Sequence, residues 1–113
     1  MEFATERIIK LTDAQNAIPT RDGKLYAELF RHGTLTVEIY APKGTDLQQP
    51  HTRDELYIVA AGHGWFSVEG HRVPFSPGDA LFAAAGEVHR FEDFTENLLT
   101  WVVFYGPEGG EGA

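Results

Sequence analysis

Short apolar runs separated by turn residues form the dominant pattern of this chain. The runs are rich in β-branched and aromatic residues, and glycine or proline bounds most of them, which is typical of β-strands. They recur about every 8 to 12 residues, the spacing expected of a β-sandwich or barrel. No stretch repeats apolar residues at the helical period of about 3.6, and no internal repeat is visible. The pattern predicts an all-β fold with strands in the ranges 25–30, 35–40, 56–61, 65–68, 71–75, 80–82, 88–91 and 98–105.

Two segments depart from the strand pattern. Residues 12–17 could form one helical turn, which Ile18-Pro19 would end because the residue before a proline avoids the helical conformation. Residues 106–113 include four glycines and little that folding could bury, so we expect a mobile tail. At 113 residues the chain fits one domain, with an arm at 1–24, a barrel at 25–105 and the tail at 106–113.

Charge and composition exclude several classes of partner. The formal net charge is -8 at pH 7, and the nine Lys and Arg residues are scattered, so neither nucleic acid nor an anionic membrane is an expected partner. The chain has no cysteine, which excludes disulfides, thiolate zinc sites and cysteine nucleophiles. Neither a leader-like N-terminus nor a long apolar segment is present, so we expect a soluble cytoplasmic protein.

Four polar residues stand out as candidate metal ligands. Gln49, His51 and Glu55 share the parity of an extended strand, and His89 lies in a later strand-like run just after a glycine turn. Two imidazoles, a carboxylate and an amide suit one divalent ion such as Mn, Fe, Co, Ni, Zn or Cu, without fixing which. Structural histidines that hydrogen-bond at the mouth of a barrel would explain the same spacing, so both interpretations stay open. The other histidines lie beside glycine in expected turns and receive no ligand role: His32, His63 and His71.

The same residues resemble the two sequence motifs of the cupin superfamily. The first motif has a glycine, five residues, His-x-His, three or four residues, a glutamate, six residues and a glycine; here Gly44 leads to Gln49-Pro50-His51, Glu55 and Gly62. The second motif has a glycine, five residues, Pro-x-Gly, two residues, a histidine, three residues and an asparagine. Here its positions are Gly78, Ala84-Ala85-Gly86, His89 and Asp93. The chain resembles a small single-domain, bacterial-type cupin, which implies a jelly-roll barrel, also called a double-stranded β-helix.

Gln49 is the departure that matters most, because the family has a histidine there. An amide oxygen is a weaker donor than an imidazole, so the resemblance implies a metal held by His51, Glu55 and His89, with Gln49 or water as a fourth ligand. Such a site keeps open positions at which a substrate or dioxygen can bind. Pocket residues expected by parity are Tyr57, Phe91, Trp101 and Phe104, although core packing is the commoner role for each.

Two functions remain open at this point. The first is a metal-dependent enzyme of small-molecule metabolism, of the dioxygenase, isomerase or lyase type. The second is a non-catalytic module that binds a sugar or an effector through a degenerate metal site, because fold alone does not decide function. Arg53 could steer an anionic substrate, or it could be a solvated loop charge. Small barrels expose edge strands, so we also expect a homodimer in which residues 25–30 extend a neighbour's sheet.

Overall fold

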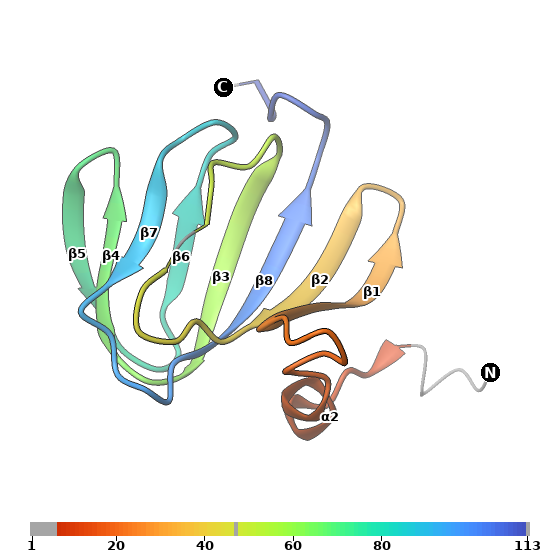
Figure 1. Cartoon of the computed structure of the whole chain (residues 1–113). Coiled ribbons are helices and arrows are strands. Elements are labelled where there is room, and N and C mark those ends of the chain that lie inside the picture. Colours follow the sequence, from red (N-terminus) through yellow and green to blue (C-terminus); the bar gives the residue numbers. More distant parts are fainter. Residues whose placement is uncertain (1–6, 47, 113) are drawn as a thin grey trace.

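The computed structural model describes residues 7–46 and 48–112, and strands dominate this part of the chain. Tight turns reverse the chain between most neighbouring strands, as Figure 1 shows. The prediction of an all-β fold is confirmed. The elements are α2 (Leu11–Asn16), β1 (Tyr26–His32), β2 (Leu35–Tyr40), β3 (Asp54–Ala61), β4 (Gly64–Val68), β5 (His71–Phe75), β6 (Ala80–Ala83), β7 (His89–Glu92) and β8 (Leu99–Tyr105).

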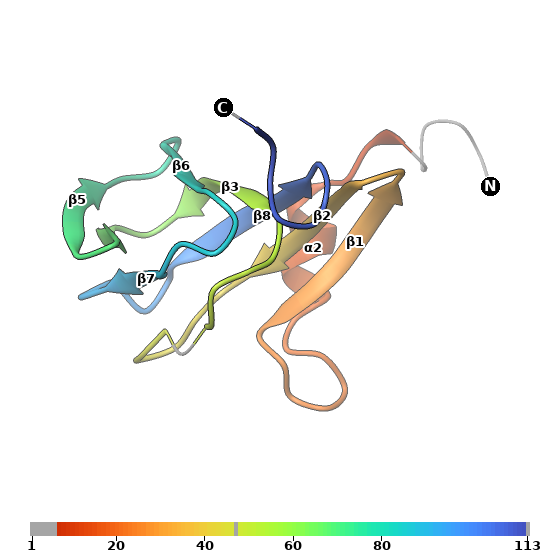
Figure 2. The ribbon, with the colours of Figure 1, turned by 90° about the horizontal axis from the view of Figure 1, so that it is seen from above.

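The strands form two antiparallel sheets. The larger sheet has the order β1-β2-β8-β3-β6, and the smaller has the order β5-β4-β7. Crossovers place β8 between β2 and β3, so strands from both ends of the chain lie side by side, as in a jelly roll. The smaller sheet stands at the β3 and β6 end of the larger one, far from β1 (Figure 2).

The main core fills the space between the two sheets. Alternate residues of each strand point to the same face, so one set of apolar side chains faces inward. Each buried aliphatic or aromatic side chain of this kind contributes about 1.5–3 kcal/mol to folding. The buried members are Tyr57, Val59, Phe66, Phe75, Ala83, Phe91, Leu98 and Val102.

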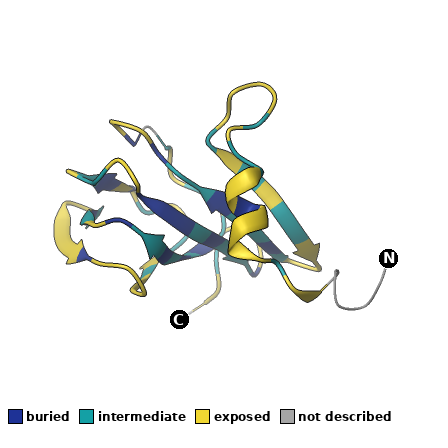
Figure 3. Ribbon diagram, turned by 90° about the horizontal axis from the view of Figure 1, so that it is seen from below, coloured by how far each residue is buried: buried dark blue, intermediate teal, exposed yellow. Residues whose placement is uncertain are grey.

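A second cluster lies on the outer face of the larger sheet. There Ala14 of α2 packs against Ile39 and Leu99, while the rest of the helix surface is exposed (Figure 3). The sequence predicted a helical turn at 12–17, and the helix indeed ends before Pro19. Because α2 covers one face of β8 and the barrel covers the other, the run 98–105 is apolar on both sides.

The described part of the C-terminal segment contacts the barrel. Gly109 donates its N–H to the Thr52 carbonyl at 2.7 Å, and Glu111 donates its N–H to Asp54 Oδ2 at 2.9 Å. The other carboxylate oxygen of Asp54 accepts the Ala85 N–H at 2.9 Å. The hydropathy of this segment did not predict these contacts, because backbone N–H groups make them and every residue except proline has one. Mobility of the segment stays a prediction.

Gly62 offers a test of the close packing between the two halves of the chain. It has φ +91°, and a Cβ there would lie 2.6 Å from the Leu98 Cα; Gly78 has φ +93° with open space around it. Both substitutions to alanine therefore strain the backbone at a positive φ. Only Gly62→Ala also creates a clash with the backbone of Leu98. We expect Gly62→Ala to lower the free energy of unfolding by about 3 kcal/mol and Gly78→Ala by about 1 kcal/mol, measured by urea denaturation. Equal losses would contradict the close approach.

Asp54 offers a test of how the C-terminal segment is attached. Hydrogen bonds from the Glu111 and Ala85 N–H groups lower the pKa of Asp54 below its ordinary value. A lowered pKa gives stability that is present above about pH 3.9 and is lost as pH falls through the folded-state pKa. We expect Asp54→Asn to destabilise the protein near neutral pH, with the deficit shrinking as the solution is acidified below that value.

The control for this test is Asp13→Asn, which removes an exposed carboxylate from α2. Denaturation midpoints of the two variants and the parent protein are compared across the acid range. A deficit of Asp54→Asn that does not depend on pH would show that its carboxylate charge has no part in the attachment.

Candidate metal centre

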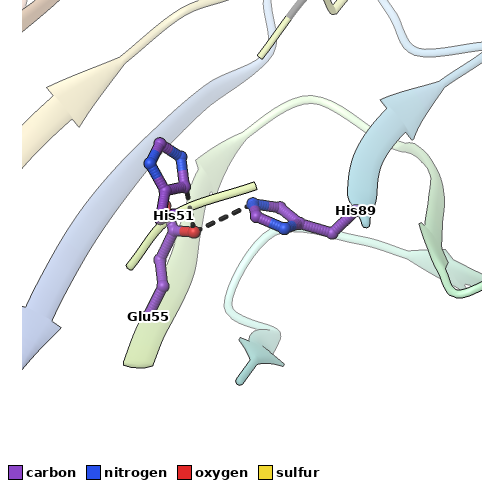
Figure 4. A group of neighbouring side chains, drawn as sticks. All are labelled: His51, Glu55 and His89. Atoms are coloured by element: carbon purple, nitrogen blue, oxygen red, sulfur yellow. Dashed lines mark ion pairs between the residues drawn. The ribbon is translucent and has the colours of Figure 1, made fainter. Parts of the chain in front are cut away.

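The structure brings three predicted ligands together at one end of the barrel. His51 lies in the loop before β3, Glu55 is the second residue of β3, and His89 is the first residue of β7. Their side chains converge on one point (Figure 4). One ligand atom from each lies within 4.8 Å of the others. Pairing with β8 holds β3, which carries Glu55, and pairing with β4 holds β7, which carries His89.

Glu55 is the centre of this group. Its Oε1 lies 2.9 Å from His89 Nε2 and 3.8 Å from His51 Nε2. Glu55 is 1% exposed, and among the described residues its Oε1 is a buried oxygen left without a well-formed hydrogen bond. Buried oxygens are rarely unsatisfied in native proteins. A cation held between this oxygen and the two imidazole nitrogens would satisfy it, so the residues present fit a divalent metal ion.

His89 is held in one orientation by its second ring nitrogen. Its Nδ1 lies 2.9 Å from the Glu87 carbonyl oxygen and donates a hydrogen bond there, which turns Nε2 toward Glu55. Burial alone would lower the pKa of His89, but the Glu55 carboxylate and the Glu87 carbonyl outweigh it and raise the pKa. A histidine that binds metal is usually anchored in this way through its other ring nitrogen.

His51 has a different environment. Its ring is half-buried and packs edge-on against Phe104, with centroids 5.0 Å apart. Burial lowers the pKa of His51, against the opposing pull of the Glu55 carboxylate. His51 is therefore neutral at physiological pH, and one ring nitrogen keeps the lone pair that a metal ligand needs.

The amide nearest this cluster belongs to Gln48 and not to Gln49. Gln48 Oε1 accepts the Tyr57 hydroxyl at 2.8 Å and lies 3.2 Å from His51 Nε2. Gln49 is exposed and lines the adjoining cavity. The parity argument assumed an extended chain from Gln49 to Glu55, but β3 begins only at Asp54. Coordination by Gln49 stays a prediction, and nothing in the sequence distinguished its neighbour.

Asp46 is a second buried residue that the sequence did not single out. It is 1% exposed, and its carboxylate accepts hydrogen bonds from the Tyr40 hydroxyl at 2.6 Å, Gln48 Nε2 at 2.7 Å and the Phe91 N–H at 2.8 Å. Its place just after a glycine turn is that of an ordinary solvated loop aspartate. Only the folded chain reveals that it is enclosed.

A cavity of about 640 Å³ opens beside the cluster. Tyr57 and Phe104, two of the expected pocket residues, are among the residues that line it. Phe91 lies behind Tyr57, with ring centroids 4.9 Å apart, and belongs to the main core. Trp101 packs in the outer cluster with Ile39 and Leu99, on the opposite face of the sheet. It has the opposite parity to Phe104 on the same strand, so its expected place in the pocket is corrected.

Arg53 and the other histidines lie outside the cluster. The Arg53 guanidinium donates to the Thr34 carbonyl and to Thr36 Oγ1, and lies over the Phe104 ring. It is therefore neither simply solvated nor free to move. Three histidines are exposed and belong to no group of candidate ligands among the described residues: His32, His63 and His71.

Fold and site together define a small single-domain jelly-roll barrel with a His-Glu-His cluster beside an open cavity. Residues 36–105 match the family model described as the cupin domain, which is more than half of the chain. The chain belongs to the cupin family. The resemblance found in its sequence is thereby confirmed.

Relatives extend over most of the chain. It is 30% identical over 104 residues to the uncharacterized protein SCO3923 of Streptomyces coelicolor, covering 90% of this chain and 98% of that protein. The structure of KdgF from Halomonas sp. has a TM-score of 0.62 at 20% identity, covering 71% of this chain and 76% of that one. The SPY1581 protein of Streptococcus pyogenes has a TM-score of 0.67 at 17% identity, covering 92% and 93%. At these identities the two structures support the fold alone.

Among the residues that the structure describes, no helix is long and apolar enough to cross a membrane.

Proposed function

We propose that this cupin binds one divalent metal ion through His51, Glu55 and His89 and acts on a small molecule held in the adjoining cavity. The observation that carries the proposal is the buried Glu55 Oε1, which lacks a hydrogen-bond partner among the described residues and faces two imidazole nitrogens. Two nitrogens and one oxygen suit Mn, Fe, Co, Ni, Zn or Cu. When bound, such an ion supplies Lewis-acid activation of a substrate or dioxygen at its open positions.

The residues around the cluster support chemistry on a bound ligand. Burial, with the nearby Glu55 carboxylate, raises the pKa of Tyr57 well above its usual range. Its hydroxyl therefore stays protonated and donates that proton to Gln48 Oε1 at the cavity wall. This surrounding is compatible with a dioxygenase, isomerase or lyase.

The alternative is a non-catalytic module that binds a sugar or effector. The observation in its favour is the exposed amide of Gln49 at a position where the family has a histidine. A weaker site would bind metal less tightly and would leave the cavity as the functional feature. Recovery of an unchanged, tightly bound ligand, with no oxygen consumption over enediols or phenolics, would favour this alternative.

Elemental analysis after addition of divalent metals tests the metal site. We expect near-stoichiometric metal in the parent protein and a loss of affinity of at least about a hundredfold in His51→Ala and His89→Ala, because each removes a ligand. His63→Ala removes an exposed imidazole outside the cluster and should retain the metal. Absence of metal in the parent protein after addition would rule out the proposal.

The two neighbouring glutamines provide an internal comparison within the same titration. Gln48→Ala removes the amide that contacts Tyr57 and His51, so we expect metal affinity to fall about tenfold through lost positioning. Gln49→Ala is expected to have a smaller effect. A larger loss in Gln49→Ala would establish Gln49 as the fourth ligand.

We also propose that the protein forms a homodimer. β1 is the terminal strand of the larger sheet, so its outer edge offers backbone groups for pairing with a second copy. Light scattering at micromolar concentration should give twice the mass of one chain. A monomer mass under those conditions would contradict the dimer and leave the metal site unaffected.

A further inference from the structure

Glu38 lines the same cavity as His51 and Glu55 but has no part in the cluster. Strand alternation on β2 places it on the inner face with Thr36 and Tyr40, while Ile39 points outward to α2. Its side chain is half-buried. Within residues 7–46 and 48–112, no hydrogen bond or ion pair engages its carboxylate.

The sheet register gives the position of Glu38 relative to the metal cluster. Glu38 and Tyr57 both pair with Val102 of β8, one from each side. Neighbouring strands are about 4.8 Å apart, so their backbones are about 10 Å apart across the sheet. The Glu38 carboxylate therefore faces the cluster across the width of one strand. The space between them is the cavity.

A half-buried carboxylate without a partner is energetically unfavourable. Burial raises the pKa of Glu38, and the negative charges of Glu28 on β1 and Glu55 on β3 raise it further. The positive charges of Arg53 and Arg31 oppose this rise without reversing it. Buried polar groups normally find a hydrogen-bond partner, so a donor from a bound molecule would complete the site.

The signs of charge around the cavity restrict that molecule. Lys43 lines the same cavity, and its Nζ also donates to the Glu96 carbonyl at 3.2 Å. Glu38 disfavours an anionic group placed beside it, and Lys43 disfavours a cationic group placed beside it. Hydroxyl groups both donate and accept hydrogen bonds, so a neutral ligand with several hydroxyls satisfies both side chains.

The remaining surface and the size of the cavity fit the same class of ligand. Tyr26 and Phe104 offer aromatic rings, against which the C–H faces of a ring-shaped molecule can pack. A volume of about 640 Å³ is that of an ordinary small-molecule site. We propose that the cavity binds a neutral, polyhydroxylated small molecule, with Glu38 accepting its hydroxyl groups and Lys43 donating to them. This inference rests on the proposed function in taking the same cavity as the ligand site.

Calorimetric and NMR titrations with matched probes test the inference. D-Glucose, D-glucosamine and D-glucuronate share one ring and differ in charge, and D-xylose is a smaller neutral probe. We expect the neutral sugars to bind at least about tenfold more tightly than the charged analogues. Glu38→Gln should weaken binding of the neutral sugars about tenfold, because the amide keeps one acceptor oxygen and loses the charge. Glu69→Gln removes an exposed carboxylate between β4 and β5, outside the residues lining this cavity, and should leave binding unchanged.

Two kinds of result would overturn the inference. One is the absence of chemical-shift changes with both neutral sugars, or tighter binding of either charged analogue. The other is equal binding by the parent protein and Glu38→Gln. Metal content measured on the same samples separates this inference from the proposed function. Metal retained without sugar binding refutes only the inference, whereas sugar binding without metal refutes only the metal site.

Discussion

The buried carboxylate of Asp46 connects the elements that form the site. It lies in the loop after β2 and accepts hydrogen bonds from Tyr40 at the end of that strand, from Gln48 in the same loop and from the backbone of Phe91 in β7. A buried carboxylate without donors would cost several kcal/mol, so such hydrogen bonds are a condition of its burial. Together with burial, Asp46 also raises the pKa of Tyr40, which keeps that hydroxyl a donor.

The contacts of Asp46 determine what Gln48 presents to the metal cluster. Its amide nitrogen donates to Asp46, so its oxygen faces Tyr57 and His51. A flipped amide would set an oxygen against a carboxylate and a nitrogen against a hydroxyl that donates. The hydrogen bond to Asp46 therefore fixes the orientation of the Gln48 amide. The Tyr57 hydroxyl in turn lies 3.2 Å from His89 Nε2, so one chain of polar contacts runs from Asp46 to the cluster.

The sequence predicted those features that depend on alternation and on motif spacing. The strands were predicted because their runs are short, apolar and bounded by glycine, and Glu55 and His89 were predicted from strand parity and from the spacing of the two motifs. Features that depend on loop conformation were not predictable. Strand parity could not show whether Gln48 or Gln49 lies nearer the metal cluster, because the loop that carries them is not extended. It also did not predict that Asp46 is buried. Trp101 shows the related limit that, on a strand buried on both faces, apolar character does not reveal which face a side chain occupies.

The two carboxylates of the cavity differ in what surrounds them, and this difference divides their roles. Glu55 faces two imidazole nitrogens, so a divalent ion there would compensate its negative charge. Glu38 has no such compensation, because β8 separates it from the cluster and like charges lie on either side. The strand order β2-β8-β3 thus produces one carboxylate suited to a cation and another suited to uncharged donors, on the same inner face of the barrel.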